Sequence, residues 1–194
     1  PAPLSVEHTV TDITCESAGL DNGTISLEVS GGSGPYNYSW STGADTKDIT
    51  GLTEGIYYVD ITDDYGCFIS DTAYVSLPPP LEFEKDISEY NGYNISCFGK
   101  EDGSIDISMT SGEEPYSYTW TGPDGFSSSD QDISGVGAGE YVISIVDNNY
   151  CTVIDTTELI QPGEFNLGLD ISQSDYGGFN VNCYGDSTGT VEII

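Results

Sequence analysis

The sequence contains no arginine and only three lysines, Lys47, Lys85 and Lys100, against 33 aspartates and glutamates. The formal net charge is therefore −30. Nucleic-acid binding depends on basic side chains that neutralise phosphates, and adhesion to anionic lipid depends on a polybasic patch. The chain has neither, so both kinds of partner are excluded, whereas its negative charge favours solubility and attracts divalent cations.

The residues and motifs of catalysis are also scarce. The single histidine, His8, lies in a segment that has no counterpart elsewhere in the chain, and we expect it on the surface of a strand. No H-E-x-x-H, C-x-x-C, P-loop or G-x-G-x-x-G motif occurs. The sequence therefore predicts a protein that is not an enzyme.

Long apolar runs are missing as well. No stretch approaches the ~20 apolar residues of a transmembrane helix, so we expect no membrane insertion in this segment. The opening PAPLSV resembles an interdomain joint, and the final TVEII stops within an apolar alternation. Both ends are expected to be cuts within a longer protein.

An internal repeat dominates what is present. CESAGLDNGTISLEVSGGSGPYNYSW at residues 15–40 matches CFGKEDGSIDISMTSGEEPYSYTW at residues 97–120, and CYGDSTGTVEII opens a third copy at residue 183. EGIYYVDITDDYGC at 54–67 matches AGEYVISIVDNNYC at 138–151. We predict one domain at 1–79, a second at 80–162 and the start of a third at 163–194, with proline-containing joints at 78–80 and 161–163.

The apolar spacing within each repeat is two, as in Ile25, Leu27 and Val29. Such alternation of β-branched and aromatic residues between Gly, Asn and Asp turns indicates strands. No convincing helical periodicity occurs. The predicted class is all-β, with tandem immunoglobulin-like β-sandwiches that form an elongated rod.

The aromatic residues of each repeat have two possible roles, a buried core stripe or an exposed platform for sugar stacking. Sandwich domains often bury a tryptophan, and a tyrosine at a strand corner often caps a loop through its hydroxyl. Tyr57 and Tyr141 each follow a glycine by two residues and fit that corner position. We favour the core role for Tyr36, Tyr38, Trp40, Tyr57, Tyr116, Tyr118, Trp120 and Tyr141.

The five cysteines follow the repeat, with one before the glycine-led strand and one in a closing turn. One strand between Trp40 and Gly55 would bring both cysteines to the same end of the domain, whereas two strands would separate them. Fourteen residues are a tight fit for two strands with turns, so one strand is favoured. The predicted disulfides are therefore Cys15–Cys67 and Cys97–Cys151, with Cys183 unpaired by truncation, and they indicate an oxidising, extracytoplasmic location.

Acid-rich turns make calcium the one candidate cofactor. Asp63, Asp64 and Asp147 lie in the closing turns, and clustered oxygen ligands suit Ca²⁺. Asp and Asn are also favoured turn formers, and no spacing matches an EF-hand, so a purely structural role stays open.

The order Cys, Gly, Pro-Tyr-x-Tyr-x-Trp, Gly-x-Tyr, Asp-x-x-Gly-Cys, Pro resembles the SprB repeat, a module of large surface adhesins of gliding Bacteroidetes. The resemblance covers both full units and the start of the third. In the second unit, Asn149 and Tyr150 replace the Tyr65 and Gly66 that precede the first unit's cysteine. The resemblance implies export by type IX secretion and display on the outer cell surface. It also implies O-glycosylation at Asp-Ser/Thr motifs, here at Thr72, Thr156 and Ser187.

Together these observations predict a structural or adhesive segment of a cell-surface adhesin that supports gliding motility or attachment to surfaces. The expected partners are neighbouring repeats and the motility and secretion machinery. A polysaccharide or abiotic surface would be bound through other parts of the protein. The alternative is an accessory carbohydrate-binding module of a secreted polysaccharide-active protein, with exposed aromatic residues.

Overall fold

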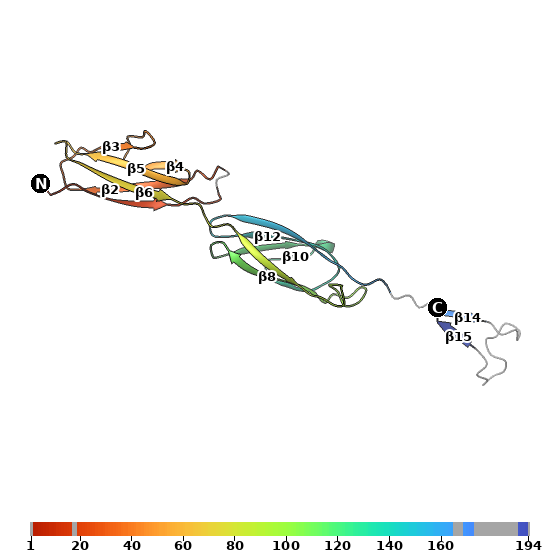
Figure 1. Cartoon of the computed structure of the whole chain (residues 1–194). Helices are drawn as coiled ribbons and strands as arrows, with labels where there is room; N and C mark the ends of the chain where they lie inside the picture. The colour runs from red at the N-terminus through yellow and green to blue at the C-terminus, as the bar shows by residue number, and fades with distance from the viewer. Residues whose placement is uncertain (1, 17–18, 165–168, 173–189, 194) are drawn as a thin grey trace.

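The computed structural model describes residues 2–16, 19–164, 169–172 and 190–193. Within residues 2–164 the chain forms two β-sandwiches that lie end to end (Figure 1). The all-β class predicted from the period-two alternation is confirmed. The helical content of the described residues is a single 3-10 turn, Pro123–Gly125, and no helix there is long and apolar enough to cross a membrane.

The first sandwich packs two antiparallel three-stranded sheets, in the orders β1-β2-β4 and β3-β5-β6. Apolar side chains at alternate strand positions point between the sheets and form one buried core. Its strands are β1 (Ser5–Thr11), β2 (Gly23–Ser30), β3 (Asn37–Trp40), β4 (Ile49–Leu52), β5 (Gly55–Thr62) and β6 (Phe68–Val75).

The second sandwich repeats this arrangement, with sheets β7-β8-β11 and β10-β9-β12-β13 around a separate core. It differs by a short additional strand, β10, beside β9. Its strands are β7 (Glu82–Ile87), β8 (Gly103–Ser111), β9 (Ser117–Thr121), β10 (Ser127–Ser128), β11 (Ile133–Val136), β12 (Gly139–Val146) and β13 (Thr152–Leu159).

In the predicted third repeat, β14 (Leu169–Ser172) pairs antiparallel with β15 (Thr190–Ile193). Cys183 and Ser187 lie outside the described residues.

The first strand of each sandwich is a repeat element that the sequence comparison missed. His8 of β1 lies opposite Leu27 of β2, and Lys85 of β7 lies opposite Ile107 of β8. Leu27 and Ile107 occupy equivalent places in the two repeats, so His8 and Lys85 do too. The expectation that the His8 segment has no counterpart is therefore wrong, because the two strands share position and pairing but little sequence.

A glycine leads the second strand of each repeat because the core leaves no room for a side chain there. A Cβ atom on Gly23 would lie 2.6 Å from Val75 Cγ1, and one on Gly103 would lie 2.6 Å from Ile95 Cδ1. Both distances are far below van der Waals contact. The glycine in each NG or DG pair is therefore a packing requirement of the sandwich.

Strands β3 and β4 run toward the same end of the sandwich. The chain between them must therefore return to the opposite end. After β3, the Trp40 N–H donates to the Ala44 carbonyl and the Gly43 N–H donates to the Trp40 carbonyl, each at 2.9 Å. The corresponding return in the second repeat is β10, which is antiparallel to β9. Two segments, the return and the strand that follows it, therefore separate β3 from β5 and β9 from β12.

Candidate functional site

A disulfide bond joins Cys15 of the first repeat to Cys151 of the second, with their Cα atoms 4.8 Å apart. Cys67 and Cys97 carry free, exposed thiols. The predicted Cys15–Cys67 and Cys97–Cys151 pairs are therefore wrong. The cysteines do form an extracellular type of bond, but it spans two repeats.

The return segment between β3 and β4 explains why the predicted disulfide pairs are wrong. Cys15 precedes β2, whereas the turn that contains Cys67 is attached beyond the other end of β2, where the Asp64 N–H donates to the Ser33 carbonyl at 2.9 Å. The eight residues of β2 span roughly 26 Å at about 3.3 Å per residue. A disulfide needs Cα atoms within about 7 Å, so the two cysteines of one repeat cannot reach each other.

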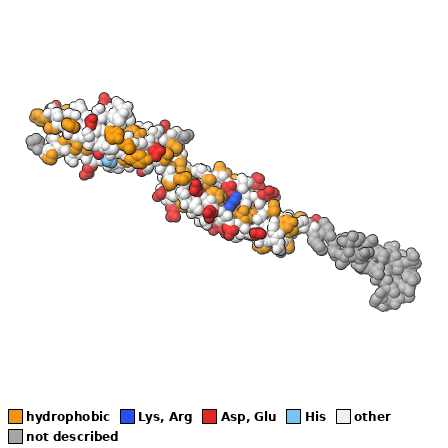
Figure 2. Space-filling view, viewed as in Figure 1, with side chains coloured by type: hydrophobic (Ala, Val, Ile, Leu, Met, Phe, Trp, Pro, Cys, Tyr) orange, Lys and Arg blue, Asp and Glu red, His pale blue; other side chains and the backbone are white. Residues whose placement is uncertain are grey.

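The disulfide belongs to a wider contact between the sandwiches, which we call the junction. The Cys15 N–H donates to the Asn149 carbonyl at 2.7 Å, so a backbone hydrogen bond accompanies the covalent bond. Beside it lies an apolar hollow of about 460 Å³, and hydrophobic side chains gather where the two sandwiches meet (Figure 2). The hollow is lined by residues that include Leu20, Leu77, Leu81 and Tyr150 and the prolines at 78–80. Proline restricts the backbone of the joint, and the disulfide and the hydrogen bond add two further links between the repeats.

Each closing turn is built around one buried aspartate. The Asp63 carboxylate accepts backbone N–H donors from Tyr65 at 3.0 Å, Cys67 at 2.9 Å and Ser33 at 3.1 Å. Desolvation by burial acts to raise the pKa of Asp63, but these donors together outweigh it and lower the pKa. Asp63 is thus held as an anion that ties the turn to the loop after β2.

Asp147 performs the same task in the second repeat. Its carboxylate accepts the N–H groups of Asn149 at 2.9 Å, Cys151 at 2.8 Å and Glu113 at 3.2 Å. This aspartate therefore orients the turn that presents Cys151 to Cys15.

The predicted calcium ligands are thus largely committed to the backbone. Both oxygens of Asp63 and of Asp147 accept hydrogen bonds, while Asp64 is exposed. In the part of the chain that the structure describes, no three His, Cys, Asp or Glu side chains gather in a way that could hold a metal ion. Calcium binding at these turns stays a prediction.

Both corner tyrosines cap a loop. The Tyr57 hydroxyl donates to the Thr53 carbonyl at 2.8 Å, and the Tyr141 hydroxyl donates to the Gly137 carbonyl at 3.1 Å. Each bond spans four residues and fixes the entry to β5 or β12. Desolvation by burial raises the pKa of Tyr141, with the carboxylate of Glu101 adding to the effect.

The other aromatic residues of the repeated motif face the cores. Trp40 is 4% exposed and Trp120 is 0% exposed. The indole N–H groups donate to the Thr46 carbonyl at 2.9 Å and the Asp130 carbonyl at 3.0 Å. The partly buried tyrosines that pack beside the two tryptophans are Tyr36, Tyr38, Tyr116 and Tyr118. These side chains therefore stabilise the sandwich and are not placed as an open platform.

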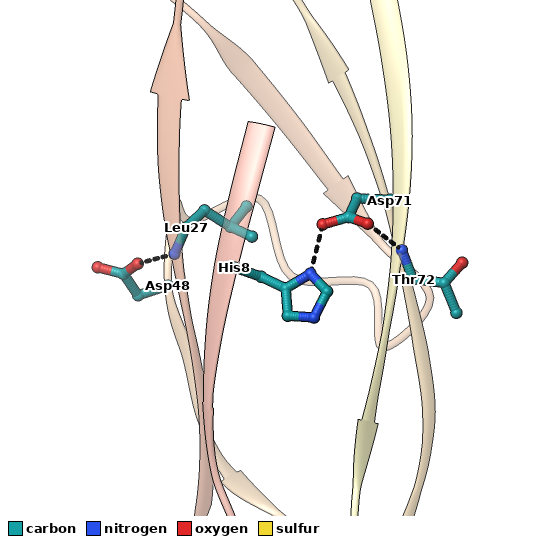
Figure 3. Close-up of polar contacts among 5 residues, drawn as sticks. All are labelled: His8, Leu27, Asp48, Asp71 and Thr72. Atoms are coloured by element: carbon teal, nitrogen blue, oxygen red, sulfur yellow. Dashed lines mark hydrogen bonds and ion pairs between the residues drawn. The ribbon is translucent and has the colours of Figure 1, made fainter. Parts of the chain in front are cut away.

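A contact between a histidine or lysine and an aspartate connects the two sheets at the same place in each repeat. His8 Nδ1 of β1 lies 2.6 Å from Asp71 Oδ2 of β6, and the other Asp71 oxygen accepts the Thr72 N–H at 2.8 Å (Figure 3). On the first sheet, Asp48 accepts the Leu27 N–H at 2.9 Å (Figure 3).

In the second repeat, Lys85 Nζ of β7 lies 2.5 Å from Asp155 Oδ2 of β13. Asp71 and Asp155 are the aspartates of the predicted glycosylation motifs. Thr72 and Thr156 are both exposed on the outer face of their sheets, so both are accessible positions for modification.

One surface feature was not identified from the sequence. Ile56, Tyr58 and Tyr74 are 55%, 56% and 53% exposed on the outer face of β5 and β6, and Ile56 lies directly opposite Tyr74. We call these three residues the β5–β6 face. The outward positions of IYYV in β5 gave a signal, because alternation assigns Ile56 and Tyr58 to the side away from the core.

The remaining surface is strongly acidic. Figure 2 shows Asp and Glu side chains distributed over the visible face of both sandwiches, with basic side chains in one small area of the second. Like charges along both bodies repel each other, which favours an extended arrangement of the repeats.

The fold and junction define the chain as a tandem β-sandwich protein whose domains are covalently linked. The SprB repeat family model matches residues 8–45 and 93–125, one segment in each sandwich. Each sandwich therefore contains a segment that matches the SprB repeat, and these matches together with the disulfide suggest a cell-surface, adhesin-type and structural segment.

Two of the solved structures that match the chain are distant from it in sequence. A C-terminal fragment of intimin, solved with the intimin-binding domain of the translocated intimin receptor, is 15% identical, with a TM-score of 0.37. That match covers 88% of this chain and 67% of the intimin fragment. Murine CEACAM1b is 13% identical with a TM-score of 0.29, covering 73% of this chain and 92% of that protein. No curated protein matches the chain.

Proposed function

We propose that this chain is a non-catalytic rod segment of a large cell-surface adhesin that supports gliding motility or attachment to surfaces. The single observation that carries the proposal is the junction, where a disulfide, a backbone hydrogen bond and a proline joint hold two SprB repeats end to end. Such a rod projects binding regions elsewhere in the protein toward a polysaccharide or abiotic surface. It also transmits force from the cell-surface motility machinery.

Export by type IX secretion, in gliding Bacteroidetes, belongs to the same proposal, as does O-glycosylation at Thr72, Thr156 and Ser187. The exposure of Thr72 and Thr156 supports modification at these positions. A glycan mass on the Thr72 peptide of native protein, absent from a Thr72→Ala variant, is the expected result. Unmodified peptides from both Thr72 and Thr156 would contradict it.

The rod function is tested in cells that carry the full-length protein. Replacing Cys15 and Cys151 together by serine is expected to leave surface display intact and to reduce attachment under shear. Antibody labelling of intact cells measures display, and detachment in a flow chamber measures adhesion. The Glu140→Gln variant is the control, because that side chain is exposed and does not line the junction hollow. Full attachment strength without the junction disulfide would argue against a force-transmitting rod.

The β5–β6 face favours a second candidate, carbohydrate binding by the first repeat. Exposed tyrosines stack on sugar rings, and the corresponding positions of the second repeat are Glu140, Val142 and Glu158. Retardation of the chain in gels that contain polysaccharide, lost in the Tyr58→Ala, Tyr74→Ala double variant, would support this function. Unchanged mobility in every polysaccharide tested would remove it.

Calcium binding is retained as a proposal for the closing turns, supported by the acidic surface and the exposed Asp64. A rise in Tm on adding CaCl₂, reversed by EDTA and reduced in Asp64→Asn, is the expected result. An equal response to MgCl₂ and to the same ionic strength of NaCl would assign the effect to charge screening instead.

A further inference from the structure

Each of the two described sandwiches presents one cysteine at each of its two ends. The opening cysteines, Cys15 and Cys97, precede the second strand, and the closing cysteines, Cys67 and Cys151, lie in the turn before the last strand. The observed bond uses the opening cysteine of the first repeat and the closing cysteine of the second. The two that remain are one of each kind, and both are exposed.

The opening cysteines are held in the same way. The Thr14 N–H donates to Asn22 Oδ1 at 3.0 Å beside Cys15, and the Ser96 N–H donates to Asp102 Oδ1 at 3.1 Å beside Cys97.

The residue two positions before each opening cysteine is also hydrogen-bonded to the segment that leaves the sandwich. The Ile13 N–H donates to the Ser76 carbonyl at 3.1 Å, and the Ile95 N–H donates to the Ile160 carbonyl at 3.2 Å. Cys97 is thus positioned at the exit of the second repeat as Cys15 is at the exit of the first.

The two closing cysteines are also held by the same hydrogen bonds as each other. The Asp63 N–H donates to the Cys67 carbonyl at 2.9 Å, and the Asp147 N–H donates to the Cys151 carbonyl at 3.1 Å. In addition, the carboxylates of these aspartates accept the cysteine N–H groups, at 2.9 Å in the first repeat and 2.8 Å in the second. Cys67 is therefore already in the conformation that lets Cys151 bond across the junction.

Apolar surface surrounds the two free thiols, as it surrounds the junction. A hollow of about 510 Å³ beside Cys97 is lined by Phe98, Pro162, Gly163 and Glu164. It corresponds in place to the junction hollow, which also contains the opening cysteine and the prolines of the joint. Around Cys67, the neighbouring Tyr65 and Phe68 are 80% and 75% exposed.

We propose that Cys97 and Cys67 are half-sites for the same bond with further SprB repeats. Cys97 bonds to the closing-turn cysteine of a repeat that follows, and Cys67 bonds to the opening cysteine of a repeat that precedes. Each repeat is then linked to both neighbours, and no bond lies within a repeat. Each bond forms when two thiols give up two protons and two electrons to a disulfide oxidant, such as oxidised glutathione, which is reduced to two thiols.

The test adds one repeat to the chain. Each sandwich has its own core, so a second copy of residues 81–162 can be placed directly after residue 164 as a folding unit, which keeps Gly163 and Glu164 beside Cys97. The protein is oxidised with glutathione, its remaining thiols are alkylated, and non-reducing peptides are identified by mass spectrometry. The expected new link joins Cys97 to the added copy of Cys151, while Cys67 and the added copy of Cys97 are alkylated.

The Cys15–Cys151 bond of the same molecule is the internal control for folding and oxidation. In a Cys97→Ser version, the added copy of Cys151 is expected to become fully alkylated. Alkylation of Cys97 beside an intact Cys15–Cys151 bond would overturn the proposal, as would a link between two opening cysteines or between two closing cysteines. Absence of the Cys15–Cys151 bond itself would also overturn it, because the first junction is its template.

Discussion

Cys15 is bonded to a cysteine 136 residues away in the next repeat, while Cys67 of its own repeat remains a free thiol. The bond therefore provides a covalent route from β1 of the first sandwich to β13 of the second. The strands between these points, which form most of both cores, lie outside that route. A pulling force along the chain passes through the disulfide and leaves the bypassed strands unstretched.

Reduction of this bond is expected to lengthen the chain under force. The bypassed segment of 136 residues corresponds to about 450–490 Å of extended chain at 3.3–3.6 Å per residue. Single-molecule pulling from the two ends should show this additional release with dithiothreitol, or in Cys15→Ser without reductant. The Cys67→Ser variant should behave as the unmodified chain. Equal release with and without reductant would show that the bond does not bridge the sandwiches.

The sequence predicted the fold better than the connectivity. Period-two alternation at Ile25, Leu27 and Val29 is a local property of a strand packed on one face, so it identified the class and the core. The disulfide partners depend on the number of chain reversals between Trp40 and Gly55. The return after β3 is held by two turn hydrogen bonds and has no apolar pattern, so alternation could not count it.

The same distinction applies to the candidate site. The corner positions of Tyr57 and Tyr141 follow from a glycine two residues earlier, a signal that is present in the sequence. The role of Asp63 could not be derived, because its backbone donor Ser33 lies thirty residues away in the chain and close only in the fold. The aspartate carboxylates that suggested cation ligands in these turns mostly accept hydrogen bonds from backbone N–H groups.

The Asp63 carboxylate should make the first repeat sensitive to acid. Because its pKa is lowered in the folded state, its contribution is complete above the unfolded carboxyl pKa of about 3.9 and is lost as pH falls through the lower folded value. Asp63→Asn should be less stable at neutral pH and lose less stability on acidification. Urea denaturation followed by Trp40 fluorescence, in a Trp120→Phe background, measures this.

Asp64→Asn is the matched control for the acid response, because Asp64 is the exposed neighbour in the same turn. It should retain the pH dependence of the unmodified repeat. An Asp63→Asn protein with that same dependence would refute the assignment.

Removing the Tyr141 hydroxyl should weaken the second repeat. Tyr141→Phe loses the hydrogen bond to the Gly137 carbonyl, a net cost of about 0.5–1.5 kcal/mol. Tyr58→Phe is the control in the first repeat, because the Tyr58 ring is 56% exposed on the outer face. Urea midpoints followed by the tryptophan of each repeat should fall for Tyr141→Phe alone. Equal midpoints for both variants would mean that the corner bond contributes nothing.

The burial of both tryptophans predicts a blue-shifted emission that acrylamide quenches poorly. Exposure of 4% for Trp40 and 0% for Trp120 leaves almost no surface for collision with the quencher. Quenching should rise sharply in denaturing urea, which serves as the reference for exposed indole. Efficient quenching of the folded chain would return the tryptophans to the role of an open sugar platform.

Gly103→Ala should destabilise the second repeat, because the new Cβ atom would lie 2.6 Å from Ile95 Cδ1 and 3.0 Å from the Val136 carbonyl oxygen. Overpacking of a dense core costs about 1–3 kcal/mol. Gly137→Ala is the matched control in the same repeat, where the nearest atoms to a Cβ are 3.7 Å away. Urea denaturation followed by Trp120 fluorescence, in a Trp40→Phe background, should show the loss for Gly103→Ala alone. If Gly103→Ala unfolds at the midpoint of the unmodified repeat, close packing is not the reason that a glycine leads this strand.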